Sequence, residues 1–345
     1  MKYYLSVCCI IKDEQNLEEF IMYHHIQGVE HFYIYDNESK IPISTRLNYF
    51  YFKKLCTIIH FPGITKQMPA YDHCMKNYKN ETKWLMVIDG DEYVLPKKHK
   101  NLRDFLKDYE DYQAIGINWV MFGTSFHDKK QNGLLVDKFR YRDANQNRHI
   151  KSIVQTQYTL DYNHPHFGII KDKNKYVDAH KRVISGPFNS NRTIDIIQIN
   201  HYVYRSAEER RLKCTRGRSD VLLPMTYSNH KNIHDDYNDV IENILPDRYA
   251  SLIRSHWSLV GMNPTIYKEL NPDLKLNTEE EYYDHAFNHS INEKRPLHIN
   301  DKYPNFNRAI YRKNYPTLIN MDDLRVDLHY ITIGVKEKRI ADKLL

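Results

Sequence analysis

The stretch WLMVIDGDEY, residues 84–93, decides how the rest of the chain is interpreted. Five mostly apolar residues run directly into Asp89, Gly90, Asp91 and Glu92. A short apolar run of this kind predicts a buried strand, and carboxylates at its end need either solvent or a positive partner. A solvated strand end is the simplest interpretation. The alternative is a cation site, and the surrounding sequence bears on that choice.

The first 125 residues alternate strand-like and helix-like segments. Short apolar runs predict strands at 4–11, 30–37, 55–61, 83–89 and 114–123. Helical spacing of apolar residues predicts helices at 14–28, 43–54, 69–80 and 101–109. Strands separated by short helices predict an α/β fold with a mostly parallel sheet and helices on both faces.

The carboxyl ends of the predicted strands are polar. Ligands of open parallel sheets bind outside these ends, and residues 12–14 (KDE), 36–39 (DNES) and 89–92 all follow strands. Across one glycine, Asp89 and Asp91 can turn toward the same oxygen-ligated cation, for which Mg²⁺ and Mn²⁺ are the natural choices. A phosphohydrolase nucleophile is disfavoured, because that motif comes early in a chain and wants Thr or Val at the place of Tyr93.

The second half of the chain is less regular. Residues 126–199 are irregular and strand-like, and residues 205–220 form a basic helical segment in which Ser206 and Glu209 predict a capping box. We expect a main domain at 1–245 and a helical C-terminal region at 246–345.

The C-terminal region contains an internal repeat. YKELNPDL at 267–274 matches YRKNYPTL at 311–318 with an offset of 44 (311 − 267), which also maps His285 onto His329 and EKR at 293–295 onto EKR at 337–339. The pattern predicts a short helix, a proline-marked turn and a second helix in each repeat, at about 266–295 and 310–339. Two repeats are few for a free-standing array. We therefore expect them to pack on the main domain, on a partner protein or on a second copy.

Composition excludes several classes of function. The net charge of +6 suits a phosphate-bearing small ligand, while the lack of a long Lys/Arg stripe argues against nucleic acid. Five cysteines without C-x-x-C spacing indicate a reducing compartment. Nowhere do about 18 apolar residues run together, so we expect no membrane span and a cytoplasmic location.

Several long segments carry a resemblance to a known family. They are CCIIKDEQNLEEFIMYHHIQGVEHFYIYDNES, KWLMVIDGDEYVLP, INWVMFGTSFH, HIKSIV, INHYVYRSAEERRLKCTRGR and HDDYNDVIEN. In this order they resemble the GT-A glycosyltransferases, and within them the DUF23 or family-92-like enzymes (glycosyl transferase family 2, group 4). The resemblance covers roughly residues 4–245. It implies a GT-A fold and transfer of a sugar from a nucleotide-diphosphate donor, by default a UDP-sugar, to a glycan or other hydroxyl.

The resemblance also implies roles for individual residues. Asp89 and Asp91 become a DxD motif that holds Mn²⁺ or Mg²⁺ on the diphosphate, and His201 becomes a further metal ligand. The nucleotide-sugar pocket is assigned to Lys12, Glu14, Asp36, Lys151, Lys213, Arg216 and Arg218. The sugar or acceptor site is assigned to Trp119, Phe122, Ser125 and His127. Each role has an alternative. His201 could be a hydrogen-bonded structural histidine, and the lysines and arginines could form a solvated basic face. Trp119 and Phe122 could pack in the core.

Leaving-group chemistry explains why such residues are needed. The departing diphosphate gains negative charge, which a divalent cation and Lys or Arg stabilise most in the transition state. In an inverting reaction, toward which the resemblance leans, a carboxylate deprotonates the acceptor hydroxyl. Asp143, Asp178 and Glu242 are candidates among which the sequence does not choose. Two departures from the family are Phe126, where many members have a small residue, and DGDE in place of DVDE.

Two rival functions remain. A sugar nucleotidyltransferase usually has a glycine-rich loop after its first strand, and residues 12–19 (KDEQNLEE) contain no glycine. A catalytically inactive glycan-binding or scaffold protein on the same fold is disfavoured by intact Asp89, Asp91 and His201.

Overall fold

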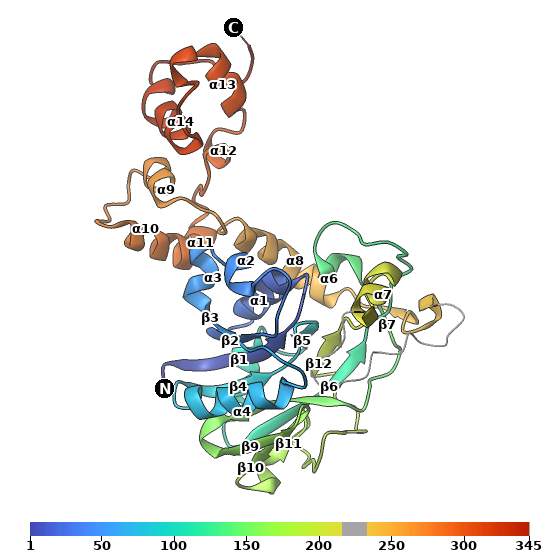
Figure 1. The fold of residues 1–345 in the computed structure, drawn as a ribbon. Coiled ribbons are helices and arrows are strands. Elements are labelled where there is room, and N and C mark those ends of the chain that lie inside the picture. Colours follow the sequence, from blue (N-terminus) through green and yellow to red (C-terminus); the bar gives the residue numbers. More distant parts are fainter. Residues whose placement is uncertain (216–232, 345) are drawn as a thin grey trace. The chain divides into compact units, whose positions relative to one another are not determined.

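The computed structural model describes residues 1–215 and 233–344. The chain divides into a larger unit, residues 1–48 and 52–253, and a smaller unit, residues 49–51 and 254–345. The described part of the larger unit is built on a nine-stranded sheet (Figure 1). Its strands lie in the order β3 (Cys56–His60), β2 (His31–Asp36), β1 (Tyr3–Ile11), β4 (Thr82–Val87), β8 (Ile150–Gln155), β6 (Ala114–Met121), β12 (Ile197–His201) and β5 (Glu92–Pro96), with β11 (Tyr176–Val177) beside β6.

Most neighbouring strands in this sheet are parallel. β1 pairs in parallel with β2 and β4, β2 with β3, and β6 with β11 and β12. The predicted α/β fold with a mostly parallel sheet is therefore confirmed. Two strands run the other way: β8 lies antiparallel between β4 and β6, and β5 lies antiparallel beside β12.

Helices cover both faces of the sheet. Phe20 of α1 (Leu17–Ile26) packs edge-on against Phe32 of β2. The next residue of that strand, Tyr33, stacks on Tyr78 of α4 (Gln67–Tyr78). Successive side chains of a strand point to opposite faces, so α1 and α4 lie on opposite sides of the sheet.

The remaining helices of this unit mostly follow their predicted positions. The helix expected at 43–54 is split into α2 (Ile43–Arg46) and α3 (Phe50–Leu55), with Asn48, a poor helix former, at the break. Asn101 is the N-cap of α5 (Leu102–Lys107), and its side chain accepts a hydrogen bond from the first turn of the helix. α7 (Ala207–Thr215) begins with the predicted capping box, in which Ser206 and Glu209 exchange hydrogen bonds. The rest of that predicted helix lies outside the described residues.

Short elements complete the larger unit. They are α6 (Leu135–Lys138), β7 (Tyr141–Arg142), η1 (Thr156–Tyr158), β9 (Thr159–His164), β10 (Phe167–Ile170), η2 (Lys173–Lys175), η3 (Ile233–Asp235), β13 (Val240–Ile241) and α8 (Ile244–Trp257), which continues past the unit boundary. β9 pairs with β10 and β7 with β13, in two small antiparallel sheets.

The described part of the smaller unit is helical. Its elements are α9 (Pro264–Leu270), α10 (Glu279–His285), the π-helical turn η4 (Ala286–Ser290), α11 (Ile291–Glu293), α12 (Ile299–Lys302), α13 (Arg308–Asn314), η5 (Pro316–Leu318), α14 (Asp323–His329) and the π-helical turn η6 (Tyr330–Gly334). With the offset of 44 residues, α9, α10 and η4 correspond to α13, α14 and η6.

Individual contacts recur at the same offset. The Tyr267 hydroxyl lies 3.1 Å from His285 Nδ1, and the Tyr311 hydroxyl lies 3.0 Å from His329 Nδ1. The helix N-caps recur as Asn263 and Asn307, and as Thr278 and Asp322. The two repeats therefore share one fold down to single hydrogen bonds.

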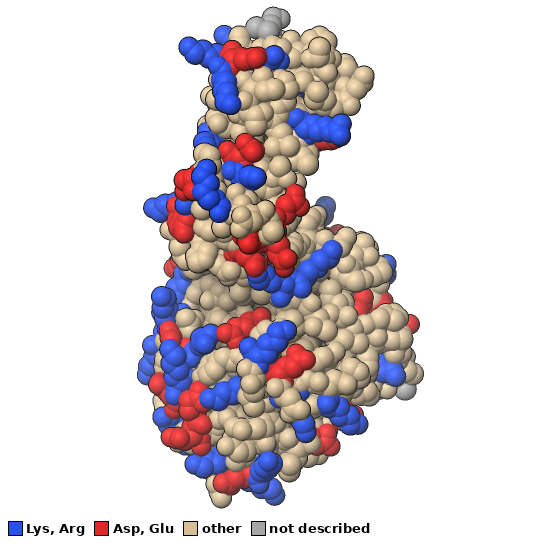
Figure 2. All heavy atoms as spheres, turned by 90° about the vertical axis from the view of Figure 1, so that its left-hand side faces the viewer, with Lys and Arg blue, Asp and Glu red and all other residues tan. Residues whose placement is uncertain are grey.

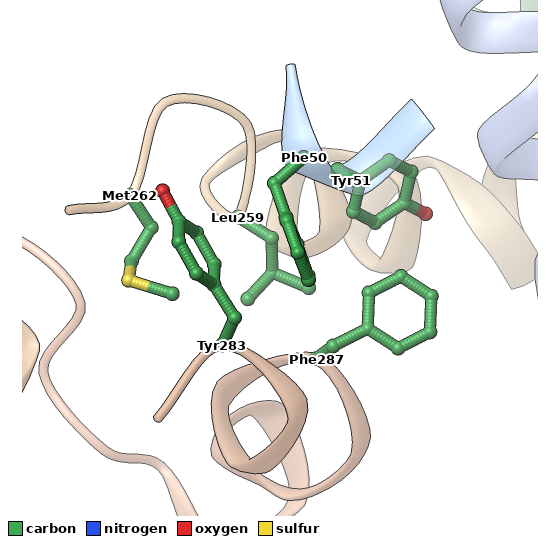
Figure 3. Close-up of a pocket in the computed structure, with 6 residues that line it drawn as sticks. All are labelled: Phe50, Tyr51, Leu259, Met262, Tyr283 and Phe287. Atoms are coloured by element: carbon green, nitrogen blue, oxygen red, sulfur yellow. The ribbon is translucent and has the colours of Figure 1, made fainter. Parts of the chain in front are cut away.

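An apolar pocket in the smaller unit marks one difference between the repeats. It is lined by Phe50, Tyr51, Leu259, Met262, Tyr283 and Phe287 (Figure 3). In the second repeat Tyr330 packs against Phe306 with ring centroids 4.5 Å apart, whereas the residue equivalent to Tyr330 in the first repeat is Ala286. On the first repeat, Phe50 stacks on Tyr283 at the pocket.

The charged side chains on the surface are mixed. On the face in Figure 2, Lys and Arg are interspersed with Asp and Glu. Among the described residues, no helix has the length and apolar character that crossing a membrane requires.

Candidate active site

The DGDE motif lies in the turn between β4 and β5. β5, which the sequence did not predict, begins at Glu92 and places that residue directly opposite His201 of β12. Gly90 sits close to the end of β1, because a Cβ atom there would stand 2.6 Å from Cδ1 of Ile11. The turn between β4 and β5 thus brings the carboxylates of the DGDE motif beside the carboxyl end of β12.

Asp89 is held by two donors. Its Oδ2 accepts a hydrogen bond of 2.9 Å from Nζ of Lys151 on β8, and its Oδ1 accepts one of 3.1 Å from Nε2 of Gln67 on α4. Burial alone would raise the pKa of Asp89, but the charge of Lys151 outweighs it and the pKa lies below its ordinary value. Asp89 is therefore ionised at neutral pH.

Lys151 is a buried cation between carboxylates. Its side chain is 1% exposed, and its Nζ also lies 3.9 Å from Oε1 of Glu92. Burial lowers the pKa of Lys151, and the charges of Asp89 and Glu92 more than compensate, so the amine stays protonated. The alternative of a solvated basic face does not describe Lys151, whose side chain is buried.

Asp91 is buried and paired with a different lysine. Lys213 of α7 donates to its Oδ2, and Nε2 of His201 lies 3.6 Å from its Oδ1. Burial opposes ionisation, yet Lys213 and His201 hold the pKa of Asp91 well below its usual range. The structure thus brings together Asp91 and His201, which the resemblance assigned to the metal, and Lys213, which it assigned to the nucleotide pocket.

His201 presents a neutral imidazole to this site. Burial lowers its pKa to about 4. Its Nδ1 is buried without a hydrogen-bond partner among the described residues, and the 3.6 Å to Asp91 is longer than a hydrogen bond. The alternative of a histidine whose hydrogen bonds are all satisfied does not fit these contacts.

Glu92 is the third carboxylate of the motif. It is fully buried, its Oε2 accepts a hydrogen bond of 2.9 Å from the backbone N–H of Asp89, and its Oε1 has no hydrogen-bond partner among the described residues. Burial raises the pKa of Glu92 well above its ordinary value.

The donor types fit a divalent cation. The buried carboxylate of Asp91 suits Mn²⁺ or Mg²⁺, and the neutral imidazole of His201 is a nitrogen ligand that a transition metal such as Mn²⁺ accepts more readily than Mg²⁺. The unpartnered Nδ1 of His201 makes no competing hydrogen bond among the described residues. Asp89 is engaged by Lys151 and Gln67. In the part of the chain that the structure describes, no three His, Cys, Asp or Glu side chains form a preorganised metal cluster.

Of the other residues assigned to the nucleotide pocket, Glu14 adjoins the motif, because a Cβ atom at Gly90 would stand 3.2 Å from its Cγ, whereas Asp36 contacts a different loop. Glu14 is buried and accepts a 2.6 Å hydrogen bond from Arg205. Asp36 accepts hydrogen bonds from the backbone N–H groups of Ser39 and Ile43, so both its oxygens stabilise the loop after β2. Lys12 is half-buried just after β1. Arg216 and Arg218 lie outside the described residues.

The two aromatic residues assigned to the acceptor site differ. Phe122 is buried against Tyr202, with ring centroids 4.6 Å apart, and belongs to the core. Trp119 is half-buried among three histidines, with centroid distances of 5.1 Å to His149, 4.8 Å to His166 and 4.4 Å to His201. Trp119 thus lies beside the carboxylate site.

The two polar residues of that assignment shape the loop after β6. Ser125 Oγ accepts hydrogen bonds from the backbone N–H groups of Arg140 and Tyr141. His127 Nε2 lies 3.2 Å from the carbonyl oxygen of Lys138. These contacts fix the conformation of the loop after β6.

The three candidate bases are engaged elsewhere. Their partners are Asn145 N–H for Asp143, His180 N–H and Arg182 for Asp178, and Lys97 and Arg142 for Glu242. None of these partners belongs to the DGDE motif or to β12. The contacts of the described residues therefore select no base among them.

Several residues of the site were not predicted from the sequence. Gln67 and Arg205 were not singled out, although each binds a carboxylate of the predicted pocket. His149 and His166 both pack against the ring of Trp119. The two histidines stand within or directly beside the strand-like segments HIKSIV and HPHFGII, and could have been noted there. No local pattern in the sequence indicates that Gln67 contacts Asp89 or that Arg205 contacts Glu14.

Comparison with known proteins agrees with the quoted segments. The profile of Glycosyltransferase family 92 matches residues 3–241. This match covers well over half of the chain, and the chain therefore belongs to glycosyltransferase family 92.

Individual relatives come from plants. Family 92 proteins of Arabidopsis thaliana, Ricinus communis and Oryza sativa subsp. japonica are each 27% identical, over 46%, 58% and 58% of this chain and 29%, 35% and 33% of their own lengths. The chain thus spans about a third of the curated relatives it matches. A solved structure of a mannose-1-phosphate geranyltransferase from Thermus thermophilus aligns over 45% of this chain and 50% of its own, with 11% identity and a TM-score of 0.25, too low to carry an argument.

Proposed function

We propose that this family 92 chain transfers a sugar from a nucleotide-diphosphate donor, by default a UDP-sugar, to a hydroxyl of a glycan or other acceptor. We further propose that the reaction depends on Mn²⁺ or Mg²⁺ and inverts the anomeric centre. One observation carries the proposal: Asp91 and the neutral His201 lie together, with the lysine pair Lys151 and Lys213 beside them.

The residues of this site suit a diphosphate leaving group. A bound divalent cation would supply charge stabilisation of the departing phosphates, with Asp91 and His201 to hold it. Lys213 now neutralises Asp91. With a cation held by Asp91 and His201, the Lys213 ammonium would be free to pair with phosphate oxygens, since a lysine acts as a mobile point charge.

Lys151 has a different task from Lys213. It is buried and bound to Asp89, with Glu92 nearby. Removing it would leave carboxylates without a counter-charge in a low-dielectric environment. We therefore assign Lys151 to keeping Asp89 ionised and oriented, and Lys213 to the substrate.

The test is a donor-cleavage and transfer assay with a panel of UDP-sugars, run with Mn²⁺, with Mg²⁺ and with EDTA. Wild type is compared with Asp91→Asn and with Asp195→Asn, a surface carboxylate paired with exposed Lys98. We expect cation-dependent cleavage that D91N loses and D195N keeps. Release of pyrophosphate from UTP and a sugar 1-phosphate would instead support a nucleotidyltransferase. Equal activity of D91N and wild type would refute the proposal.

The cytoplasmic location stays a prediction. The same holds for docking of a partner protein or a second copy through the repeats.

A further inference from the structure

Arg205 lies in the short connection between β12 and α7, in a backbone conformation that arginine disfavours. Its φ is 57°, in the left-handed region, and residues that their surroundings hold in this region cluster at binding and active sites. The connection is tied to the DGDE motif, because the N–H of Tyr202 donates to the carbonyl oxygen of Asp91 at 2.9 Å. The fold therefore holds Arg205 three residues away from a direct backbone contact with the motif.

The guanidinium of Arg205 is buried beside the motif. The residue is 7% exposed, and its Nη2 donates a 2.6 Å hydrogen bond to Oε1 of Glu14. Glu14 in turn adjoins Gly90, where a Cβ atom would stand 3.2 Å from the Cγ of Glu14. Burial lowers the pKa of Arg205, but the charges of Glu14 and Asp91 outweigh it and raise that pKa. The guanidinium therefore lies within the field of Asp91, the carboxylate that we assign to the cation.

Most of the hydrogen-bonding capacity of this guanidinium is unused. It has five N–H donors, yet among the described residues only Glu14 accepts from it, and its Nε is buried without a partner. The other carboxylates whose charges raise its pKa are Asp91 and Glu209. Asp91 accepts from Lys213, and Glu209 is bound to its capping partner on α7. A buried cation with unsatisfied donors is costly, which favours an anionic ligand at this place.

We propose that Arg205 binds the diphosphate of the nucleotide donor directly, while Glu14 holds its guanidinium in place. A planar guanidinium can donate two parallel hydrogen bonds to one phosphate, a geometry that the point charge of Lys213 lacks. Arg205 therefore orients the diphosphate, and Lys213 supplies mobile charge. This inference rests on the proposed function, and it adds a substrate-binding residue that the sequence did not single out.

The test is calorimetric titration of UDP, with Mn²⁺ present, into wild type, Arg205→Met, Arg205→Lys and Arg312→Met. Arg312 is the matched control, because it also has one acidic partner, Asp323, and a buried Nε without a hydrogen-bond partner among the described residues, but it belongs to the second repeat. We expect R205M to weaken UDP binding at least about tenfold. R205K should weaken it about fivefold, since lysine keeps the charge but not the fork, and R312M should bind UDP like wild type.

Uridine, which lacks the phosphates, separates a phosphate contact from a general loosening of the pocket. Ligand-observed NMR should show that R205M and R205K bind uridine as wild type does. Thermal unfolding reports whether each variant folds. If R205M does not fold, R205K decides alone, because it keeps a positive charge beside Glu14.

Two results would overturn the inference. One is R205K binding UDP as tightly as wild type. The other is an equal loss of UDP and uridine binding, which would show that Arg205 only supports the structure of the pocket. Absence of Mn²⁺-dependent UDP binding in wild type is a separate readout, and it would remove the proposed function together with this inference.

Discussion

The DGDE site and the tandem repeats use buried polar groups in opposite ways. In the repeats, the Tyr–His hydrogen bond occurs twice with nearly the same length. In the site, by contrast, His201 Nδ1 and Glu92 Oε1 are buried without hydrogen-bond partners among the described residues. Unsatisfied buried groups cost free energy. Others occur elsewhere in the described residues, among them Arg312 Nε of the second repeat, but these two lie on residues paired across β5 and β12, beside the carboxylates of the motif.

The two regions also differ in how charge is balanced. At the site, three carboxylates share two lysines that come from distant elements, Lys151 of β8 and Lys213 of α7. In the repeats, Arg295 pairs with Glu293 and Arg339 with Glu337, each two residues away and partly exposed. Local exposed pairs contribute little, whereas buried long-range pairs make the site sensitive to single substitutions.

The largest effect should follow from Lys151→Met. This change leaves the half-buried Asp89 and the fully buried Glu92 without the buried cation that faces them, and breaking a buried pair typically costs about 3–5 kcal/mol. Urea unfolding measures the loss. The matched control is Arg339→Met, which removes a partly exposed pair of the second repeat and should shift stability by no more than about 1 kcal/mol. Equal losses of stability in K151M and R339M would show that the buried ion pairs of the site contribute no more than the local pairs of the repeats.

A smaller effect, with a defined pH dependence, should come from Glu19 of α1. Its carboxylate accepts the N–H groups of Leu135 and Val136, and burial raises its pKa to about 7. A raised pKa means that the folded state binds more protons than the unfolded state between about pH 4.5 and 7. Stability from this group is therefore full below about 4.5 and is lost as pH rises through 7.

Glu19→Gln tests this dependence, because glutamine mimics the protonated acid. The stability of the variant relative to wild type should rise by up to about 3 kcal/mol between pH 4.5 and 7 and be flat outside that window. Denaturant unfolding across pH 4 to 8 measures it. A difference that does not change with pH would show that Glu19 titrates normally.

Lys213→Met should separate cation binding from nucleotide binding. Removing the ammonium frees Asp91, so affinity for Mn²⁺ alone should rise about tenfold, or about 1.4 kcal/mol. Affinity for UDP in the presence of Mn²⁺ should fall by a similar factor, because the diphosphate loses a counter-charge. Calorimetric titration gives both values. A change of the same sign in both would contradict the role assigned to Lys213.

The smallest effect should come from the duplicated hydrogen bond. Tyr267→Phe and Tyr311→Phe each remove one Tyr–His bond and should each cost about 1 kcal/mol, with no change in donor cleavage. Thermal unfolding and the cleavage assay measure the two outcomes. If either variant changed cleavage, the repeats would belong to the catalytic machinery rather than stand in contrast to it.

Local patterns in the sequence predicted much of the fold. Apolar runs located β1, β2, β4 and β6, and the Ser206–Glu209 capping box was visible because its partners are three residues apart. β5 was not predicted, because it begins at Glu92 within the charged motif, and the motif indicates the end of a strand rather than the start of one. The break at Asn48 was missed because helical spacing continues on both sides of it.

Contacts between distant residues could not be predicted. Arg205 binds Glu14, 191 positions away, and Gln67 binds Asp89 from a helix on the face of the sheet. Nothing in the spacing of either pair marks it, because topology alone brings them together. The same reason explains why the three candidate bases could be named but not ranked.

The most direct test of the central claim is calorimetric titration of UDP into the wild-type chain and into Asp91→Ala, each with and without Mn²⁺. We expect UDP to bind the wild-type chain only when Mn²⁺ is present, and we expect D91A to lose this binding. Binding of UDP to D91A as tightly as to wild type, or no binding to wild type with Mn²⁺ present, would contradict it.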